Sequence, residues 1–195
     1  IVLFFESKGF SLTQIMILQG TYSLFVALFE IPSGFFADIY GRKNSLVIGS
    51  IFLFLGYVIF SFFSGFNEFL FAEILLGVGG SLISGADSAI LYDTLLEIKE
   101  EDEYTKIEGR TYAIGNFSEG IAGVLGGFLA MTSLNMPVYI QTIVMFLSIP
   151  IAMTLVEPKS SYKLAKSFSS IITVVKDTFI YQRKLRWYIV YSSSM

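Results

Sequence analysis

The sequence predicts an all-α membrane protein, folded as a bundle of transmembrane helices. Hydrophobic residues make up 54% of the 195-residue chain and charged residues only 15%, and the mean hydropathy is +0.68. Soluble domains rarely have such a composition. Five apolar runs each reach the length of about 20 helical residues that crosses a bilayer. The basic residues gather on one side of these runs, as they do in multi-pass membrane proteins.

The apolar runs define the predicted transmembrane helices. In chain order they are 12–37, 45–64, 69–94, 109–132 and 136–156. The chain also begins with IVLFF and ends with LRWYIVYSSSM, which we interpret as the end of one helix and the start of another. We therefore expect a six-helix bundle whose helix 1 is truncated, followed by the start of helix 7, in a chain cut from a larger protein.

Lys and Arg residues set the predicted orientation. The loops on one side carry a single base, Lys8. The other twelve bases lie on the opposite side: Arg42, Lys43, Lys99, Lys106, Arg110, Lys159, Lys163, Lys166, Lys176, Arg183, Lys184 and Arg186. Short loops rich in Lys and Arg stay in the cytoplasm, so we expect a multi-pass protein of the cell membrane. The loops predicted to be cytoplasmic are 37–44, 97–108 and 157–185.

The chain divides into three predicted regions. Residues 1–156 form the amino-terminal transmembrane bundle, 157–185 a cytoplasmic connector, and 186–195 the start of helix 7. Within the connector, 167–184 has the pattern of an amphipathic helix that lies on the membrane surface, where its bases meet anionic lipid headgroups. A solvated linker between two halves is the alternative.

Acidic residues inside the predicted spans mark helices that line a polar interior. Helices 45–64 and 136–156 contain no ionisable residue. The acids in the other spans are Glu30, Glu73, Asp87, Asp93 and Glu119. A charge within the bilayer is costly, so such acids normally face the bundle interior or a water-filled cavity. Each set of three consecutive spans ends in a charge-free helix, which favours two inverted three-helix repeats.

Three of these acids are the predicted proton or substrate sites. No Lys or Arg lies well inside any span, so Glu30, Asp87 and Glu119 have no basic partner in this chain. A buried carboxylate without a partner takes up a proton or binds a cation. The alternative is a permanently protonated acid that makes one helix–helix hydrogen bond, or one that pairs with a base on a missing helix. Glu73 lies near the outer end of its span, and we expect it to reach the membrane surface.

Small residues repeat at helical spacing along the acid-bearing helices. Such stripes allow helix backbones to approach closely within a membrane. The predicted helix-packing residues are Gly77, Gly80, Gly115, Gly123, Gly126 and Gly127.

The residue types that are absent argue against catalysis. The chain has no Cys and no His. It therefore has no disulfide, no Cys/His metal site, no thiol nucleophile and no imidazole base. It also lacks a phosphate-binding loop and a Ser–base arrangement. We expect no enzyme, no cofactor, no metal site and no nucleic-acid partner.

The turn between the first two complete spans, GFFADIYGRK, has a specific pattern. Its key residues are Gly34, Asp38, Gly41, Arg42 and Lys43. The pattern, at this place in the topology, resembles the signature turn of the major facilitator superfamily. The resemblance covers the six spans, the connector and the start of the seventh span. It implies the amino-terminal half of a twelve-helix major facilitator fold.

The resemblance also implies a role for the turn. In the family it forms a cytoplasmic latch, completed by an acid at the inner end of helix 4, and Asp93 is at the matching place. Two positions depart from the family pattern. Glu73 stands where helix 4 often carries an Arg, so a proton-coupling role of that Arg cannot be carried over. Ala122 and Gly123 stand where antiporters often have Gly-Pro in helix 5, which weakens the case for antiport.

These features predict a secondary transporter that works by alternating access. Our preferred interpretation is a proton-coupled antiporter for the efflux of a small lipophilic or cationic compound, because this acid-bearing, aromatic-rich half has no base well inside its spans that would bind an anion. The expected partners are membrane lipid, a small-molecule substrate, protons and the missing carboxy-terminal half. One alternative is a proton-coupled nutrient symporter of the same fold. The other is a membrane binding or scaffold protein that transports nothing.

Overall fold

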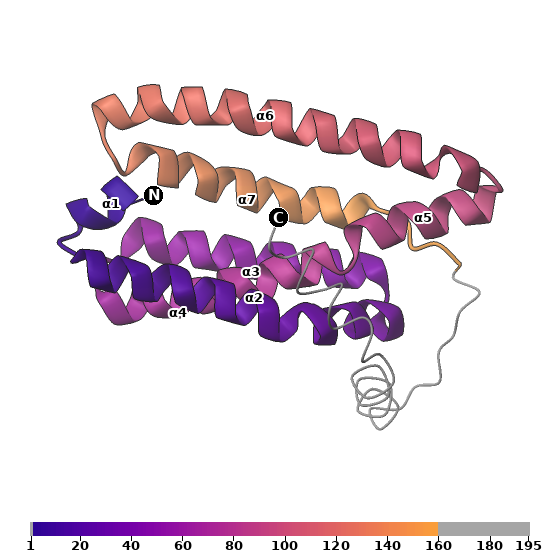
Figure 1. Cartoon of the computed structure of the whole chain (residues 1–195), viewed down its shortest axis with the longest axis horizontal. Coiled ribbons are helices and arrows are strands. Elements are labelled where there is room, and N and C mark those ends of the chain that lie inside the picture. The colour runs from indigo at the N-terminus through magenta and orange to yellow at the C-terminus, as the bar shows by residue number, and fades with distance from the viewer. Residues whose placement is uncertain (1, 160–195) are drawn as a thin grey trace, which may run out of the picture. The chain divides into compact units, whose positions relative to one another are not determined.

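A computed structural model describes residues 2–159, and all the regular elements in that range are helices (Figure 1). They are α1 (Val2–Ser7), α2 (Leu12–Tyr40), α3 (Arg42–Phe62), α4 (Phe66–Ser84), α5 (Asp87–Ile98), the 3-10 helix η1 (Glu101–Glu103), α6 (Tyr104–Thr132) and α7 (Met136–Thr154).

Five segments of the described range are long and apolar enough to cross a membrane, when α5 is taken with α4 and η1 with α6. The prediction of an all-α membrane bundle is confirmed. Its arrangement as two inverted repeats stays a prediction. The amphipathic segment 167–184 and the start of helix 7 at 186–195 lie outside the described residues.

Local sequence signals set both ends of α2. At its start, the backbone N–H of Gln14 donates to Oγ of Ser11, and the backbone N–H of Ser11 donates to Oε1 of Gln14. This reciprocal pair of hydrogen bonds is a capping box. At its end, Gly41 has φ +103°, a conformation that side-chain-bearing residues rarely adopt. Helix α3 begins at the next residue, so a single glycine turns the chain between two long helices.

The third predicted span is interrupted, which corrects the expectation of one helix over 69–94. Helix α4 ends at Ser84, and α5 begins at Asp87. A Cβ on the intervening Gly85 would lie 3.0 Å from the backbone nitrogen of Gly34 and 3.1 Å from Oγ of Ser33. The break therefore sits directly against the backbone of α2. Oδ1 of Asp87 accepts a hydrogen bond from the Ser88 N–H at the new helix start.

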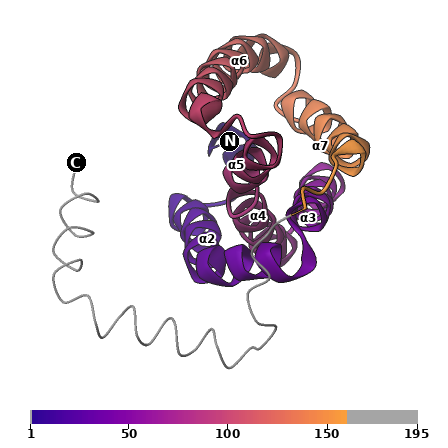
Figure 2. The same cartoon turned by 90° about the vertical axis from the view of Figure 1, so that its right-hand side faces the viewer.

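Helices α2, α3 and α4 pack together, and α7 packs along α3 (Figure 2). One cluster of buried residues gathers Phe4, Phe5, Ile15, Leu18, Phe60, Phe69, Ala72 and Leu76. A second, smaller cluster gathers Ala37, Leu46, Ala86 and Ala152, at the end of the bundle that carries the α2–α3 turn. We call this the turn end.

Glycines set the closest approach between α3 and α4. A Cβ on Gly49 would lie 2.9 Å from the carbonyl oxygen of Gly79, and a Cβ on Gly79 would lie 2.9 Å from that of Gly49. A Cβ on Gly56 would lie 2.7 Å from the side chain of Leu76. Such backbone contact between helices is typical of membrane bundles.

Helix α6 is the least packed of the long helices. It contacts α5, η1 and α7 but lies apart from α2 (Figure 2), and most of its residues are exposed and none is buried. A helix this apolar needs either lipid or further protein around it.

Candidate functional site

The α2–α3 turn carries a three-residue charge cluster at the turn end. Nε of Arg42 donates to Oδ2 of Asp93 on α5 over 2.6 Å. Nη2 of the same guanidinium lies 3.5 Å from Oδ1 of Asp38, in the last turns of α2. The Arg42 and Asp93 side chains are only 18% and 14% exposed. Arg42 therefore joins α2, α3 and α5, and the structure brings together Asp38, Arg42 and Asp93, three of the residues predicted for the cytoplasmic latch.

Glu157 joins this cluster from beyond the end of α7. Its Oε1 accepts from the Arg42 backbone N–H over 2.8 Å, and its Oε2 accepts from the Lys43 backbone N–H over 2.7 Å. These N–H groups belong to the first turn of α3, where they have no partner within the helix and where the helix dipole favours an anion. The carboxylate thus caps α3 from a distant part of the chain.

Gly41 leaves room for this cap. A Cβ at this position would lie 3.1 Å from Cδ of Glu157, so a side chain is disfavoured by contact as well as by backbone conformation. Glu157 was not among the functional residues predicted from the sequence. The available signal was its position: it is the first acid after the predicted span 136–156, on the same predicted side of the membrane as the turn.

A second acid holds the start of the connector. The Lys159 backbone N–H donates to Oε2 of Glu97 over 3.0 Å. Glu97 lies near the end of α5, so the residues that follow α7 are hydrogen-bonded to both α3 and α5.

The predicted proton or substrate acids lie apart from one another. Glu30 on α2, Asp87 at the start of α5 and Glu119 in the middle of α6 are all exposed within the described part of the chain. None of the three lines the cavities described below. Their role stays a prediction.

The predicted packing glycines divide between two helices. On α4, a Cβ on Gly77 would lie 2.8 Å from Cβ of Phe25 in α2, and one on Gly80 would lie 3.6 Å from the hydroxyl of Tyr22. On α6, a Cβ would meet no atom of the described residues within 4 Å at any of the predicted positions, namely Gly115, Gly123, Gly126 and Gly127. The structure therefore places only the α4 glycines against another helix.

Glu73 is buried, which corrects the expectation that it reaches the membrane surface. Its side chain is 3% exposed, and Oε1 has no hydrogen-bond partner among the described residues. Glu73 lies seven residues after Phe66, so it is about 10 Å along α4, too deep to reach the helix end.

Glu73 lines a cavity of about 310 Å³ between four helices. The other lining residues are Gln19, Tyr22, Leu53, Tyr57, Leu76, Gly80 and Met145. Glu73 was not among the acids predicted from the sequence as proton or substrate sites.

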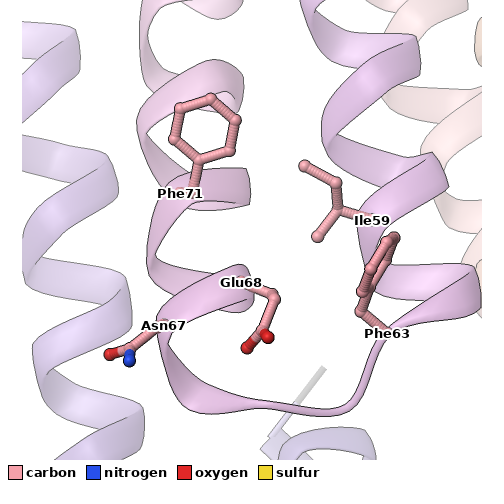
Figure 3. A pocket seen from close by; sticks show the side chains of 5 residues that line it. All are labelled: Ile59, Phe63, Asn67, Glu68 and Phe71. Carbon is pink, nitrogen blue, oxygen red and sulfur yellow. The ribbon is translucent and has the colours of Figure 1, made fainter.

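Two further cavities are more apolar. One, of about 450 Å³, lies between α1, α3, α6 and α7, and its lining includes Gly126 and Gly127. The other, of about 340 Å³, lies beside the α3–α4 turn and is lined by Ile59, Phe63, Asn67, Glu68 and Phe71 (Figure 3). The described residues contain no group of three or more acidic side chains that could hold a metal ion.

Comparison with known proteins gives one family and two relatives. A family model described as Major Facilitator Superfamily matches residues 1–195. The chain is 33% identical over 85 residues to the uncharacterized MFS-type transporter YxaM of Bacillus subtilis (strain 168), covering 44% of this chain and 21% of that protein. It is 27% identical over 136 residues to the uncharacterized MFS-type transporter MJ1560 of Methanocaldococcus jannaschii, covering 69% of this chain and 34% of that protein. The matches thus span about a third or less of these relatives.

Proposed function

The chain belongs to the major facilitator superfamily, and we propose that it forms the amino-terminal half of a secondary transporter that works by alternating access. Both curated relatives are named as transporters of this type. The observation that carries the proposal is the cluster at the turn end, where Arg42 pairs with Asp38 and Asp93 and Glu157 caps α3.

This cluster acts as a reversible latch at the cytoplasmic end of the bundle. It consists of ion pairs and hydrogen bonds that join the end of α2, the start of α3, Asp93 on α5 and the segment after α7, so it can break without unfolding any of these helices. The apolar contacts of α2, α3 and α4 lie toward the opposite end of the bundle and hold these helices together during the movement. With the latch formed, the cytoplasmic end is closed and the transporter faces outward.

Proton coupling is the proposed driving force. Glu30, Asp87 and Glu119 are the candidate carriers, because a carboxyl in the membrane interior can exchange a proton as its access changes sides. The described part of the spans has acids and many aromatic side chains but no deeply placed base. We propose the export of a small lipophilic or cationic compound on this ground.

Proton movement in inverted membrane vesicles tests this function. Vesicles containing the full-length protein are energised to an acidic lumen, a pH-sensitive dye reports the gradient, and a panel of lipophilic cations is added. We expect at least one cation to trigger proton efflux in the wild type, and Glu119→Gln to abolish it. Glu101→Gln, in the exposed η1 segment, is the matched control.

The outcomes separate the parts of the proposal. Efflux that survives Glu119→Gln keeps export and assigns the proton to Glu30 or Asp87, which are then tested in the same way. No efflux with any cation contradicts proton-coupled export. Uptake of a nutrient with inward proton flow, measured in right-side-out vesicles, would then make the protein a symporter.

A further inference from the structure

Glu73 is a buried acid that the proposed proton and substrate sites leave unused. Its side chain is 3% exposed, and its Oε1 has no hydrogen-bond partner among the described residues. Isolated polar atoms of this kind are rare in folded proteins, because their loss of hydration is not compensated. A buried carboxyl group that faces a cavity indicates that something else supplies the missing partner.

The cavity beside Glu73 has the lining that a cation requires. Gln19 and Tyr22 contribute from α2, Tyr57 from α3 and Met145 from α7. The titratable groups among the lining residues are Glu73 and the two tyrosines, and none of the lining residues is a base. The amide and phenol oxygens accept hydrogen bonds, and tyrosine rings attract cations through their faces. An ionised Glu73 would therefore be a negative charge in a lining that contains no base.

The size of the cavity favours an organic ion over a metal ion. Its volume of about 310 Å³ is at the lower end of the range for small-molecule sites, roughly 300–1,000 Å³. A divalent metal ion would need several oxygen ligands, commonly from more than one carboxylate, whereas this lining holds only Glu73. Leu53, Leu76 and Met145 instead offer apolar surface for hydrocarbon groups.

We propose that this cavity binds a small organic ammonium ion, with Glu73 as its counter-charge and with Tyr22 and Tyr57 packed against its alkyl or aryl groups. The inference rests on the proposed function in that it names the substrate class of the transporter. It places substrate recognition on a different residue from the acids proposed to carry protons.

Binding to the purified full-length protein in detergent tests the site without requiring transport. The probe is radiolabelled benzyltrimethylammonium, whose positive charge does not change with pH, measured by equilibrium dialysis. We expect saturable binding to the wild type with a Kd below about 1 mM. Glu73→Gln keeps the shape of the side chain but removes the charge, and should weaken binding by about tenfold or more.

Three further variants sharpen the assignment. Glu73→Asp retains the carboxylate and should bind better than Glu73→Gln. Gly80→Val retains Glu73 but places a side chain beside the Tyr22 hydroxyl, and should weaken binding by filling the cavity. Glu68→Gln is the matched control, because Glu68 lies on the same helix but at the exposed α3–α4 turn (Figure 3), and should bind as the wild type does. Size-exclusion elution identifies any variant that does not fold.

Either of two results overturns the inference: no binding by the wild type, or equal binding by the wild type and Glu73→Gln. Failure of the inference and failure of the function are distinguishable. If the cation binds at Glu73 but is not transported, the proposed function fails and the site stands. If cations drive proton efflux but Glu73→Gln binds them normally, the function stands and the site fails.

Discussion

Arg42 and Asp93 are 51 residues apart in the sequence, yet Nε of Arg42 donates to Oδ2 of Asp93 over 2.6 Å. Both side chains are largely shielded from solvent. A charge-assisted hydrogen bond in such a place is stronger than an exposed ion pair, which contributes little. It connects the start of α3 to α5, so these two helices are held together at the turn end.

Removing the charge of Asp93 should weaken this connection between α3 and α5. We expect Asp93→Asn to lower the free energy of unfolding by about 1–3 kcal/mol, because the Arg42 guanidinium loses its closest charged acceptor. The melting temperature of the full-length protein in detergent measures the direction of the effect. A double-mutant cycle with Arg42→Gln isolates the pair.

Lys43→Gln is the control for this pair, because the Lys43 side chain makes no ion pair within the described range. It should change stability much less than Asp93→Asn does. Additive effects of Asp93→Asn and Arg42→Gln would contradict a direct interaction.

The Glu157 cap gives a second prediction. Glu157→Gln should destabilise the protein by about 1 kcal/mol, a value reduced for the solvent exposure of the site. The amide keeps one acceptor oxygen, but its NH₂ group faces a backbone N–H and the favourable interaction with the helix dipole is lost. Limited proteolysis of the segment after α7 measures the effect, and cleavage should be faster in the variant.

Glu101→Gln serves as the matched control for Glu157→Gln, since Glu101 is exposed in η1 and makes no hydrogen bond within the described part of the chain through its side chain. Equal cleavage rates in wild type and Glu157→Gln would show that the cap does not hold this segment.

The glycine contact between α3 and α4 gives a third prediction, in which the same Gly→Ala change affects stability differently at two positions. Gly49→Ala should destabilise the protein by roughly 1–3 kcal/mol, because its Cβ would lie 2.9 Å from the carbonyl oxygen of Gly79 and the helices must separate. Gly20→Ala, in the interior of α2, meets nothing within 4 Å and should be neutral or stabilise by up to about 1 kcal/mol through helix propensity.

Melting temperatures of the two glycine variants under identical detergent conditions provide the comparison. A melting temperature of Gly49→Ala at or above that of Gly20→Ala would contradict a tight α3–α4 contact at Gly49.

Hydropathy predicted the membrane helices because it averages over many residues, and the apolar runs are long. The break at Gly85 escaped this averaging, although Ser84, Asp87 and Ser88 flank it, because the runs beyond these residues are apolar. At the break, Gly85 lies against the backbone of α2 at Gly34, a contact that only the folded chain reveals. The signature pattern of the turn predicted Asp38, Arg42 and Asp93 as neighbours because the family resemblance supplied the pairing.

The two missed acids show where sequence reasoning stops. Glu73 was expected near the surface because the helix was predicted to begin at residue 69. It begins at Phe66, which places Glu73 nearly one turn deeper. Glu157 is an acid just past a predicted span. Its local sequence does not indicate that the segment after α7 lies beside the start of α3.

Solute counterflow in proteoliposomes tests most directly whether the protein is an alternating-access transporter. Liposomes containing the full-length protein are loaded with an unlabelled lipophilic cation and diluted into a trace of the labelled cation, with protein-free liposomes as the control. Alternating access predicts a transient accumulation of label inside the liposomes, because the carrier exchanges outer label for inner unlabelled cation. Label that binds to the protein but never enters the lumen, for every cation tested, would contradict the account and favour a binding or scaffold protein.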